Sequence, residues 1–406
     1  MLTITMAILI AVLGSVSAMA YDYAELYAEL DSDYYTRFKG QNISINVYNW
    51  GEYISDGSDD SLDVNQAFEE LTGIKVNYTF YATNEELYAK LRAGGSSYDV
   101  VIPSEYMIGR MIKEDLLEPI NKDNIPNFSN IDPKWTNMEY DPGNTYSVPY
   151  TWGTVVLLYN TEMVSADTDV ETWDLLWNEK YKNNILMFNN PRDAYGIALK
   201  KLGYGINPEN LEQIEKATKA LKEQKPLVQA YVMDEIFDKM GAGEAAVAPY
   251  YAGDAITMMD DNPALASAFP REGTNIFIDS MCIPKGAKQK EAAEMYINFM
   301  CEAAVGAANC EYIGYSTPNT AAFALLDEEI TSNPIAYPPD EVLAKAEYFV
   351  ILDDDLAKAF DNGWKVLLAD DESFTYWLVP ALLLLAVVAS IVVVFRKANK
   401  KNREHY

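Results

Sequence analysis

The hydrophobic periodicity of this chain switches repeatedly between strand spacing and helix spacing. Ile43, Ile45 and Val47 alternate with polar residues and predict a strand. The next apolar residues recur at helical spacing up to Gly73, and the same change from strand to helix occurs twice more before Lys113. Three strand-then-helix units in a row predict a parallel or mixed sheet with helices on both faces, which is an α/β fold.

A second series of strands and helices begins after a Pro- and Asp-rich stretch at 131–149. Its predicted elements are strands at 154–159, 185–188 and 245–249 and helices at 173–181, 191–202 and 209–224. After Phe277, Ile278 and Asp279 the pattern returns to the first domain. A chain that crosses twice between two α/β lobes leaves a cleft and a hinge of few strands, suited to closing on a ligand. The predicted boundaries are 41–154 with 278–323 for lobe 1, and 155–277 with 324–372 for lobe 2.

Both ends of the chain are apolar enough to predict contact with a membrane. Residues 1–20 end in a Ser-Ala-Met-Ala run and predict either a signal peptide or an N-terminal membrane anchor. Residues 377–395 carry no charge and predict a transmembrane helix. The basic tail at 396–406 predicts a cytoplasmic C-terminus, with the rest of the chain outside the cytoplasmic membrane. The acidic, Tyr-rich residues 21–40 predict a solvated tether or the charged face of a short amphipathic helix.

The charge and the cysteine and histidine content limit the chemistry. There are 61 acidic and 31 basic residues, and the formal net charge of −30 repels nucleic acid and attracts cations. The only histidine, His405, is in the predicted tail, so the ectodomain lacks Ser-His and Cys-His mechanisms and His-based metal catalysis. Cys282, Cys301 and Cys310 match no zinc motif, and the last two are either bridged or buried thiols. No catalytic residue, cofactor or metal is predicted.

The first predicted strand runs into an aromatic and acidic cluster, Asn49 to Tyr53. Loops at strand ends are where α/β proteins bind ligands, and the faces of Trp50 and Tyr53 attract cations. The alternative is that the two aromatic residues only pack this loop onto the core. Taken alone, the cluster favours this packing role, and the rest of the chain has to decide whether it is one wall of a site for an organic cation with Glu52 as the first candidate partner.

Five separated motifs extend this interpretation. They are Val47–Tyr53, Thr72–Val76, Tyr98–Ser104, Tyr146–Gly153 and Ile313–Asn319. In this order they resemble the spermidine/putrescine-binding proteins of bacterial ABC importers, with similarity from about Ile43 to Leu368. The resemblance implies the periplasmic-binding-protein type II fold: two α/β lobes joined by a hinge, with a ligand cleft between them. The predicted C-terminal transmembrane helix is added to this fold.

The resemblance also implies a set of polyamine contacts. Asp193 stands where the family has a Glu that binds an amine, and Tyr251 and Phe277 stand where Trp is frequent. Asn190 replaces an Asp that binds an amine, and Phe349 replaces a Gln, so both remove polar contacts and favour a shorter ligand such as putrescine, or another amine. The implied ligand contacts are Trp50, Tyr53, Ser104, Tyr106, Asp193, Tyr251, Phe277, Asp279 and Tyr315.

Several of these positions have a structural alternative. Asn190 and Asp193 flank Pro191 as at an ordinary helix start, Ser104 suits a helix cap, and Tyr315 could pack a turn. Asp279 differs, because a carboxylate in a buried apolar segment needs a cationic partner or several donors. The amine is therefore expected to pair with Asp279 rather than with Glu52.

The implied function is capture without chemistry. A monomeric ectodomain, tethered to the membrane, would bind putrescine or spermidine and pass it to ABC permease subunits, while a separate ATPase drives transport. One alternative is a ferric-ion-binding protein of the same fold, with Tyr250 and Tyr251 as iron ligands. A second is an anchored glycosidase, which needs only two carboxylates flanking aromatic residues.

Overall fold

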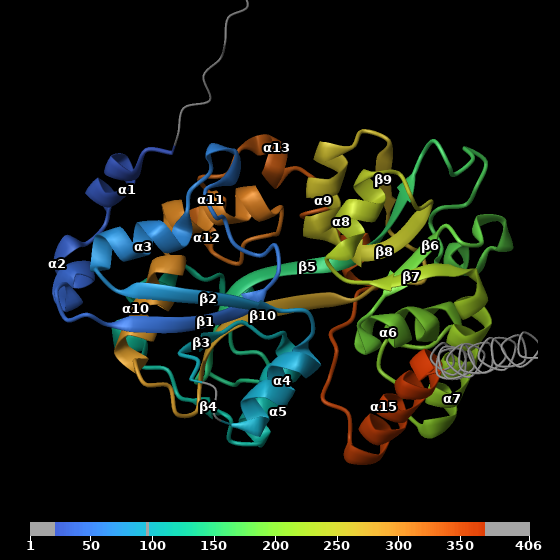
Figure 1. Cartoon of the computed structure of the whole chain (residues 1–406), viewed down its shortest axis with the longest axis horizontal. Helices are drawn as coiled ribbons and strands as arrows, with labels where there is room; N and C mark the ends of the chain where they lie inside the picture. The colour runs from blue at the N-terminus through green and yellow to red at the C-terminus, as the bar shows by residue number, and fades with distance from the viewer. Residues whose placement is uncertain (1–20, 95–96, 370–406) are drawn as a thin grey trace, which may run out of the picture.

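The computed structural model describes residues 21–94 and 97–369 of the chain (Figure 1). Its centre is a mixed sheet with the strand order β2-β1-β3-β10-β5-β8-β6-β7, in which β4 also pairs with β10 and β9 with β5. The strands are β1 (Ser44–Trp50), β2 (Lys75–Tyr81), β3 (Val100–Val101), β4 (Leu117–Glu118), β5 (Ser147–Asn160), β6 (Ile185–Phe188), β7 (Val228–Val232), β8 (Val247–Tyr251), β9 (Leu265–Ala268) and β10 (Ile276–Pro284).

Helices cover both faces of this sheet at each of its ends (Figure 1). We call the end with β1, β2 and β3 lobe 1 and the end with β6, β7 and β8 lobe 2. The helices are α1 (Tyr23–Glu29), α2 (Ser32–Tyr35), α3 (Val64–Thr72), α4 (Asn84–Ala93), α5 (Glu105–Lys113), α6 (Pro191–Lys201), α7 (Leu211–Gln224), α8 (Glu235–Gly241), α9 (Ala252–Asp261), α10 (Lys290–Met300), α11 (Ala303–Ile313), α12 (Thr320–Phe323), α13 (Glu328–Thr331), α14 (Asp340–Leu343) and α15 (Asp354–Ala369).

The predicted strands and helices occur in the predicted order, but two of them differ in form or extent, and β7, α8, α9 and β9 were not predicted. Thr83 and Glu86 have the sequence spacing of a capping box at the start of α4, and Thr83 Oγ1 accepts a hydrogen bond from Glu86 N at 3.1 Å. Gly73 ends α3 with a φ of 73°. Residues 173–181 form two short 3₁₀ turns rather than one helix, because Asn178 between them has an extended backbone. The strand predicted at 154–159 is the second half of β5, which begins within the Pro- and Asp-rich stretch.

Three segments connect the two lobes. β5 pairs with β10 through residues 147–154 and with β8 and β9 through residues 155–160, so one strand belongs to both lobes. The second connection is the segment that leads into β10. The third is the strap, defined here as residues 345–350, which leads to α15. Glu347 joins the last two, because its N–H donates to Thr274 O at 3.0 Å and its carbonyl accepts from Ile276 N at 3.0 Å.

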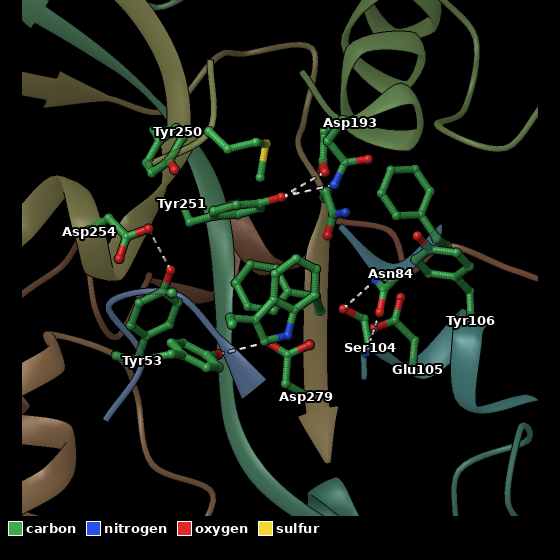
Figure 2. A pocket seen from close by; sticks show the side chains of 18 of the residues that line it. Tyr53, Asn84, Ser104, Glu105, Tyr106, Asp193, Tyr250, Tyr251, Asp254 and Asp279 are labelled. Atoms are coloured by element: carbon green, nitrogen blue, oxygen red, sulfur yellow. Dashed lines mark hydrogen bonds between the residues drawn. The ribbon is translucent and has the colours of Figure 1, made fainter. Parts of the chain in front are cut away.

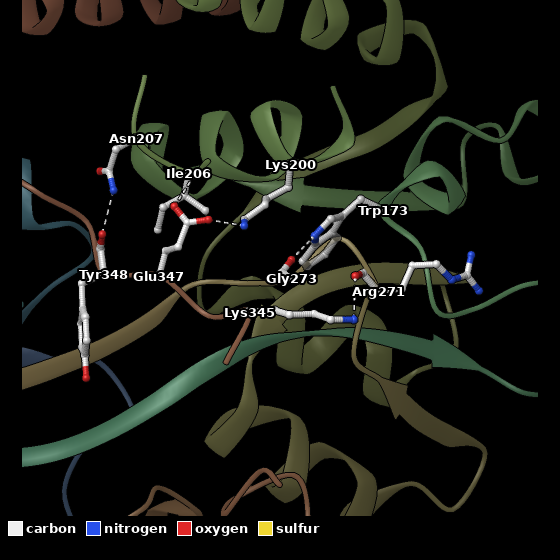
Figure 3. Close-up of polar contacts among 9 residues, drawn as sticks. All are labelled: Trp173, Lys200, Ile206, Asn207, Arg271, Gly273, Lys345, Glu347 and Tyr348. Carbon is white, nitrogen blue, oxygen red and sulfur yellow. Dashed lines mark hydrogen bonds and ion pairs between the residues drawn. The ribbon is translucent and has the colours of Figure 1, made fainter. Parts of the chain in front are cut away.

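Side chains of lobe 2 hold the strap and the neighbouring segment (Figure 3). Lys200 on α6 forms an ion pair with Glu347, whose other carboxylate oxygen accepts from Ile206 N at 3.2 Å. Asn207 Nδ2 donates to the carbonyl of Tyr348 at 2.8 Å. The strap is thereby fixed to lobe 2 while it pairs with the strand segment that enters lobe 1.

Each lobe has its own hydrophobic core. Phe68 on α3 packs against Tyr296 and Phe299 of α10 in lobe 1, and all three are almost fully buried. In lobe 2, Trp173 and Phe188 are buried in a separate cluster. Two cores connected by three chain segments match the two-lobe architecture that was predicted. The lobe boundaries given above from the sequence remain a prediction.

Residues 21–40 pack against lobe 1. Asp22 and Asp31 cap the short helices α1 and α2 with their side chains. Leu26, Leu30 and Tyr35 are buried in the lobe 1 core. Of the two predicted arrangements, a solvated tether or an amphipathic helix with a charged face, the structure has the second.

The predicted fold class needs one correction. The two-lobe α/β architecture is observed, but within residues 21–94 and 97–369 no helix has the length and apolar character needed to span a bilayer. The helix predicted at 377–395, the tail at 396–406 and the leader at 1–20 all lie outside the described residues. The C-terminal transmembrane helix is therefore not part of the fold that the structure supports.

The three cysteines are buried free thiols. Cys301 follows α10 and Cys310 lies within α11, and no bond joins them, so the bridge considered from the sequence is absent from the structure. Burial raises the pKa of both thiols, which keeps them protonated.

The packing of residues 21–40 predicts a specific loss of stability. Leu26→Ala should lower the free energy of unfolding by about 2–4 kcal/mol, because Leu26 is 3% exposed. Leu325→Ala is the control, since Leu325 is 58% exposed and its loss should change stability by less than about 0.5 kcal/mol. Denaturant unfolding measures both, and equal effects would show that α1 does not contribute to the core.

Candidate ligand-binding site

A pocket lies between the two lobes, at the ends of β1, β3 and β8 and beside β10 (Figure 2). The empty space around its lining residues is about 570 Å³, part of which is open to solvent. All nine residues predicted as ligand contacts line it. The full lining is Trp50, Gly51, Tyr53, Asn84, Ser104, Glu105, Tyr106, Asn190, Asp193, Met233, Asp234, Tyr250, Tyr251, Asp254, Asn275, Phe277, Asp279, Tyr315 and Phe349.

Trp50 and Tyr53 reach the pocket because β1 ends there. Trp50 Nε1 donates to the carbonyl of Ile102 at 2.9 Å, which fixes the indole plane beside the pocket. The Tyr53 hydroxyl donates to Asp279 Oδ2 at 2.7 Å. Glu52 between them is exposed and is not among the lining residues, so the preference for Asp279 over Glu52 agrees with the geometry.

Ser104, Glu105 and Tyr106 enter the pocket at the start of α5. Ser104 occupies the N-cap position, but its side chain makes no cap hydrogen bond. Instead, Ser104 Oγ accepts from Asn84 Nδ2 at 3.0 Å. Tyr106 donates to Glu85 Oε1 at 3.1 Å. The Ser104 hydroxyl is thus free of the helix-capping role and is held at the pocket wall by Asn84.

Asp279 projects from β10 at a β-bulge between residues 279 and 280. It is 4% exposed, and its Oδ1 atom has no hydrogen-bond partner among the described residues. Burial raises the pKa of Asp279 to about 6, although the hydroxyls of Ser104 and Tyr53 oppose this shift. The strand therefore presents a buried carboxylate with one unused acceptor.

Asn190 and Asp193 act both at a helix start and in the pocket. Asn190 Oδ1 accepts from Arg192 N at 3.1 Å as the N-cap of α6, while its Nδ2 donates to the Tyr251 hydroxyl at 3.2 Å. That hydroxyl donates in turn to Asp193 Oδ2 at 2.9 Å. Burial raises the pKa of Asp193 to about 7. The helix-start interpretation and the site interpretation therefore apply to the same residues.

Aromatic rings connect the lobes around these carboxylates. Tyr251 of lobe 2 packs edge-on against Phe277 of β10, with 5.5 Å between ring centroids. Tyr315, which follows α11, donates to Asp254 Oδ2 on α9 at 2.9 Å. A Cβ at Gly253 would overlap the Tyr315 ring, so only glycine allows this approach of the lobes. These contacts are those of a closed pocket.

Two buried acids of the pocket, Glu105 and Asp254, were not predicted from the sequence. Burial raises the pKa of Glu105 to about 8 and raises that of Asp254 well above its usual range. Both acids lie in the first turn of a helix that follows a strand, which is a position typical of ligand sites. Among the described residues, none of the ion pairs involves Glu105, Asp193, Asp254 or Asp279. The pocket therefore collects acidic groups that form no ion pair with a cation among the described residues.

A two-lobe α/β structure with a pocket between the lobes is the architecture of proteins that bind a small ligand between two domains. The chain belongs to the bacterial extracellular solute-binding protein family, which it matches over residues 64–338. Members of this family bind solutes and are not enzymes. The prediction that the chain is not an enzyme is therefore confirmed by its family.

Individual relatives agree with this assignment. A spermidine/putrescine-binding periplasmic protein of Salmonella typhimurium is 36% identical over 308 residues, which cover 76% of this chain and 86% of the relative. A putrescine-binding periplasmic protein of Pseudomonas aeruginosa is 31% identical over 340 residues, covering 80% and 91% of the two chains. A solved structure from Listeria monocytogenes, described as a putative spermidine/putrescine ABC transporter, is 36% identical with a TM-score of 0.76, covering 80% and 98%. The resemblance seen in the five motifs is confirmed.

The buried acids predict how stability depends on pH. The pKa values of Glu105, Asp193 and Asp279 are raised to about 8, 7 and 6, above their values of about 4 in an unfolded chain. The folded protein then binds more protons than the unfolded chain in this range, so stability without ligand should fall as pH rises from 5 to 8. The expected loss is on the order of 1 kcal/mol or more, measured by denaturant unfolding at each pH.

Asp193→Asn should reduce this pH dependence, because it removes one buried titrating group. Asp123→Asn is the matched control, since Asp123 is exposed and should leave the dependence unchanged. If the wild type and Asp193→Asn show the same slope, Asp193 is not a proton-binding group of the folded state.

Proposed function

We propose that this chain is the extracytoplasmic polyamine-binding component of an ABC importer, which captures putrescine or spermidine in the interlobe pocket. It would act as a monomer and deliver the ligand to permease subunits, with transport driven by a separate ATPase. The names of the relatives support the ligand class, the importer and the compartment outside the cytoplasm.

The observation that carries this proposal is the set of buried pocket acids that form no ion pair with a cation among the described residues. Unpaired burial of a charge costs several kcal/mol, which the raised pKa values of Asp193 and Asp279 reflect. An ammonium group restores a partner and donates charge-assisted hydrogen bonds. Asp279 Oδ1 is buried and has no partner among the described residues. It is therefore the acceptor that we assign to an amine of the ligand.

The remaining pocket walls suit the apolar part of a polyamine. Trp50, Tyr251 and Phe277 present ring surfaces, which bury methylene groups and attract cations through their faces. Phe349 and Asn190 line the pocket without carrying a charge, so the proposed charged contacts are Asp193 and Asp279. No covalent step is involved: binding is the whole function of the site.

A ligand in this pocket would contact both lobes and would therefore favour their closure. Asp279 and Trp50 belong to lobe 1, and Asp193 and Tyr251 belong to lobe 2. A ligand that touches both lobes has higher affinity for the closed state and shifts the population toward it. The closed form would be the one that the permease recognises.

The ferric-ion alternative fits this geometry poorly. Tyr251 donates its hydroxyl proton to Asp193, and Tyr250 stacks on Phe188 within the lobe 2 core. Burial raises the pKa of both phenols well above the usual range, which opposes the phenolate form that iron prefers. The glycosidase alternative is set aside because the family consists of non-enzymatic binding proteins.

Asp279→Asn tests the proposed amine contact. The variant should keep its fold and lose putrescine and spermidine affinity by at least roughly 100-fold, because it removes the charged acceptor of a buried pair. Calorimetry with putrescine, spermidine, spermine, Fe³⁺ and an oligosaccharide measures this on the wild type and the variant. Amine affinity that is unchanged in Asp279→Asn would place the contact elsewhere.

Asp99→Asn is the control for Asp279→Asn. Asp99 is also buried, but it accepts hydrogen bonds from Asn46, Lys288 and Gln289 backbone N–H groups outside the pocket. It should therefore lower stability and leave amine affinity unchanged. Wild-type protein that binds Fe³⁺ but none of the amines would contradict the proposed function itself.

Gly253→Ala tests lobe closure. Its methyl group would meet the ring of Tyr315 from the other lobe and strain the closed state. Amine affinity should fall by roughly tenfold, as a strain of about 1.4 kcal/mol would produce, and X-ray scattering should show less compaction on adding putrescine. The control is Gly241→Ala on α8, where the added methyl group has no neighbour within 4 Å. Wild-type affinity in Gly253→Ala would exclude this contact from the closed state.

A further inference from the structure

Two carboxylates line one wall of the pocket, that of Glu105 on α5 and that of Asp279 on β10 (Figure 2). They come from adjacent backbone segments, because Ser104 forms a β-bridge with Asp279, and Glu105 Oε2 accepts from Ile278 N at 3.1 Å. Glu105 is 2% exposed and Asp279 is 4% exposed. Both side chains are thus fixed in place and almost fully removed from water.

Each of these carboxylates has one oxygen in use and one oxygen without a partner. Asp279 Oδ2 accepts from Tyr53 and Glu105 Oε2 accepts from Ile278, whereas Asp279 Oδ1 and Glu105 Oε1 accept no hydrogen bond from the described residues. Buried polar atoms in native proteins nearly always have partners, so the two unused acceptors on this pocket wall need donors from a bound molecule, either a ligand or ordered water.

The nearby cation does not provide these donors. Arg192 on α6 donates from Nη2 to Asn207 Oδ1 at 3.2 Å and to the Val350 carbonyl at 3.0 Å. Its guanidinium lies over the rings of Tyr106 and Phe349, with centroid distances of 4.8 and 4.6 Å. Arg192 therefore attracts Glu105 through space without forming an ion pair with it.

We infer that Glu105 and Asp279 form a two-carboxylate site for a single alkylammonium group with at least two N–H donors, and that Glu105 releases a proton when this group binds. The inference rests on the proposed function and adds a residue and a ligand requirement to it. A primary or secondary ammonium supplies two donors for the two unused oxygens. A quaternary ammonium has no N–H donor, so both oxygens remain without a hydrogen bond. The cost for each oxygen is comparable to that of a lost charged hydrogen bond.

Proton release follows from the groups around Glu105. Burial is the largest influence and raises its pKa to about 8, the negative charge of Asp279 adds to this, and Arg192 and the Ile278 N–H oppose it. The phenols of Tyr140 and Tyr348 also face Glu105, and both stay protonated because burial raises their pKa. At pH 7 the free protein therefore holds Glu105 as a carboxylic acid. When an ammonium that is already charged binds, the Glu105 O–H bond breaks and the proton leaves to solvent.

Calorimetry of putrescine binding tests this, with the full chain at pH 7 in two buffers of different ionisation enthalpy. Wild-type protein should release protons when it binds putrescine. In Glu105→Gln the number of protons released should be lower by almost one. The part due to Asp193 should remain, because Asp193 also titrates near pH 7. At pH 9, where Glu105 is ionised before binding, Glu105→Gln should weaken putrescine binding by roughly tenfold or more. The permethylated bis-quaternary analogue of putrescine should not bind the wild type.

Controls separate this site from a structural effect. Glu294→Gln changes a glutamate that is equally buried but lies on α10, where it accepts from Asn121 and Asn124, and it should leave proton release unchanged. Should Glu105→Gln fold poorly, Glu105→Asp keeps the acid, shortens its reach and should still weaken binding. Equal proton release and affinity in wild type and Glu105→Gln would overturn the inference, as would tight binding of the quaternary analogue. Failure of the proposed function is a different result, in which the wild type binds no amine.

Discussion

The arrangement of the whole molecule depends on the pairing of β5 with β10. β5 is a single strand that pairs with β10 in its first half and with β8 and β9 in its second half, so both lobes share one continuous backbone. β10 brings Phe277 and Asp279 to the boundary between the lobes, and the bulge next to Asp279 turns its side chain into the pocket. The strap pairs with the segment that leads into β10 and leads to α15 in lobe 2. The hinge and Asp279, the proposed amine contact, therefore belong to the same strands.

Burial of acids is the second constraint, and it opposes stability. Glu105, Asp193, Asp254 and Asp279 are each less than a tenth exposed, and burial raises the pKa of each. A core of this size would be more stable with neutral residues at these positions. The large hydrophobic cores of the two lobes offset this cost, and a ligand that neutralises the acids recovers part of it on binding. Stability and affinity are thus linked through the same carboxylates.

Much of the fold could be predicted from the sequence because the signals are local. The alternation in β1, the capping box of α4 and the glycine after α3 depend on neighbours within a few residues. Positions that the family resemblance covers, such as Trp50 and Asp279, could be assigned to one pocket from the sequence alone. Glu105 could not, because its role comes from Ile278, 173 residues away, and from two unused oxygens that only three-dimensional packing reveals. The packing of residues 21–40 on lobe 1 could not be decided for a similar reason: charge pattern alone does not show which apolar residues find a core.

Because the pocket carboxylates are buried, salt should affect the rate of ligand association differently from the rate of ligand dissociation. The net charge of −30 acts on a cation through solvent, where salt screens it over about 8 Å at physiological ionic strength. Asp279 and Glu105 are almost excluded from water, so dissolved ions cannot screen their contact with a bound ammonium. Salt should therefore slow the association of ligand with this protein but leave its residence time nearly unchanged. In surroundings whose salinity varies, the frequency of ligand binding would change, whereas the lifetime of the bound complex would change little.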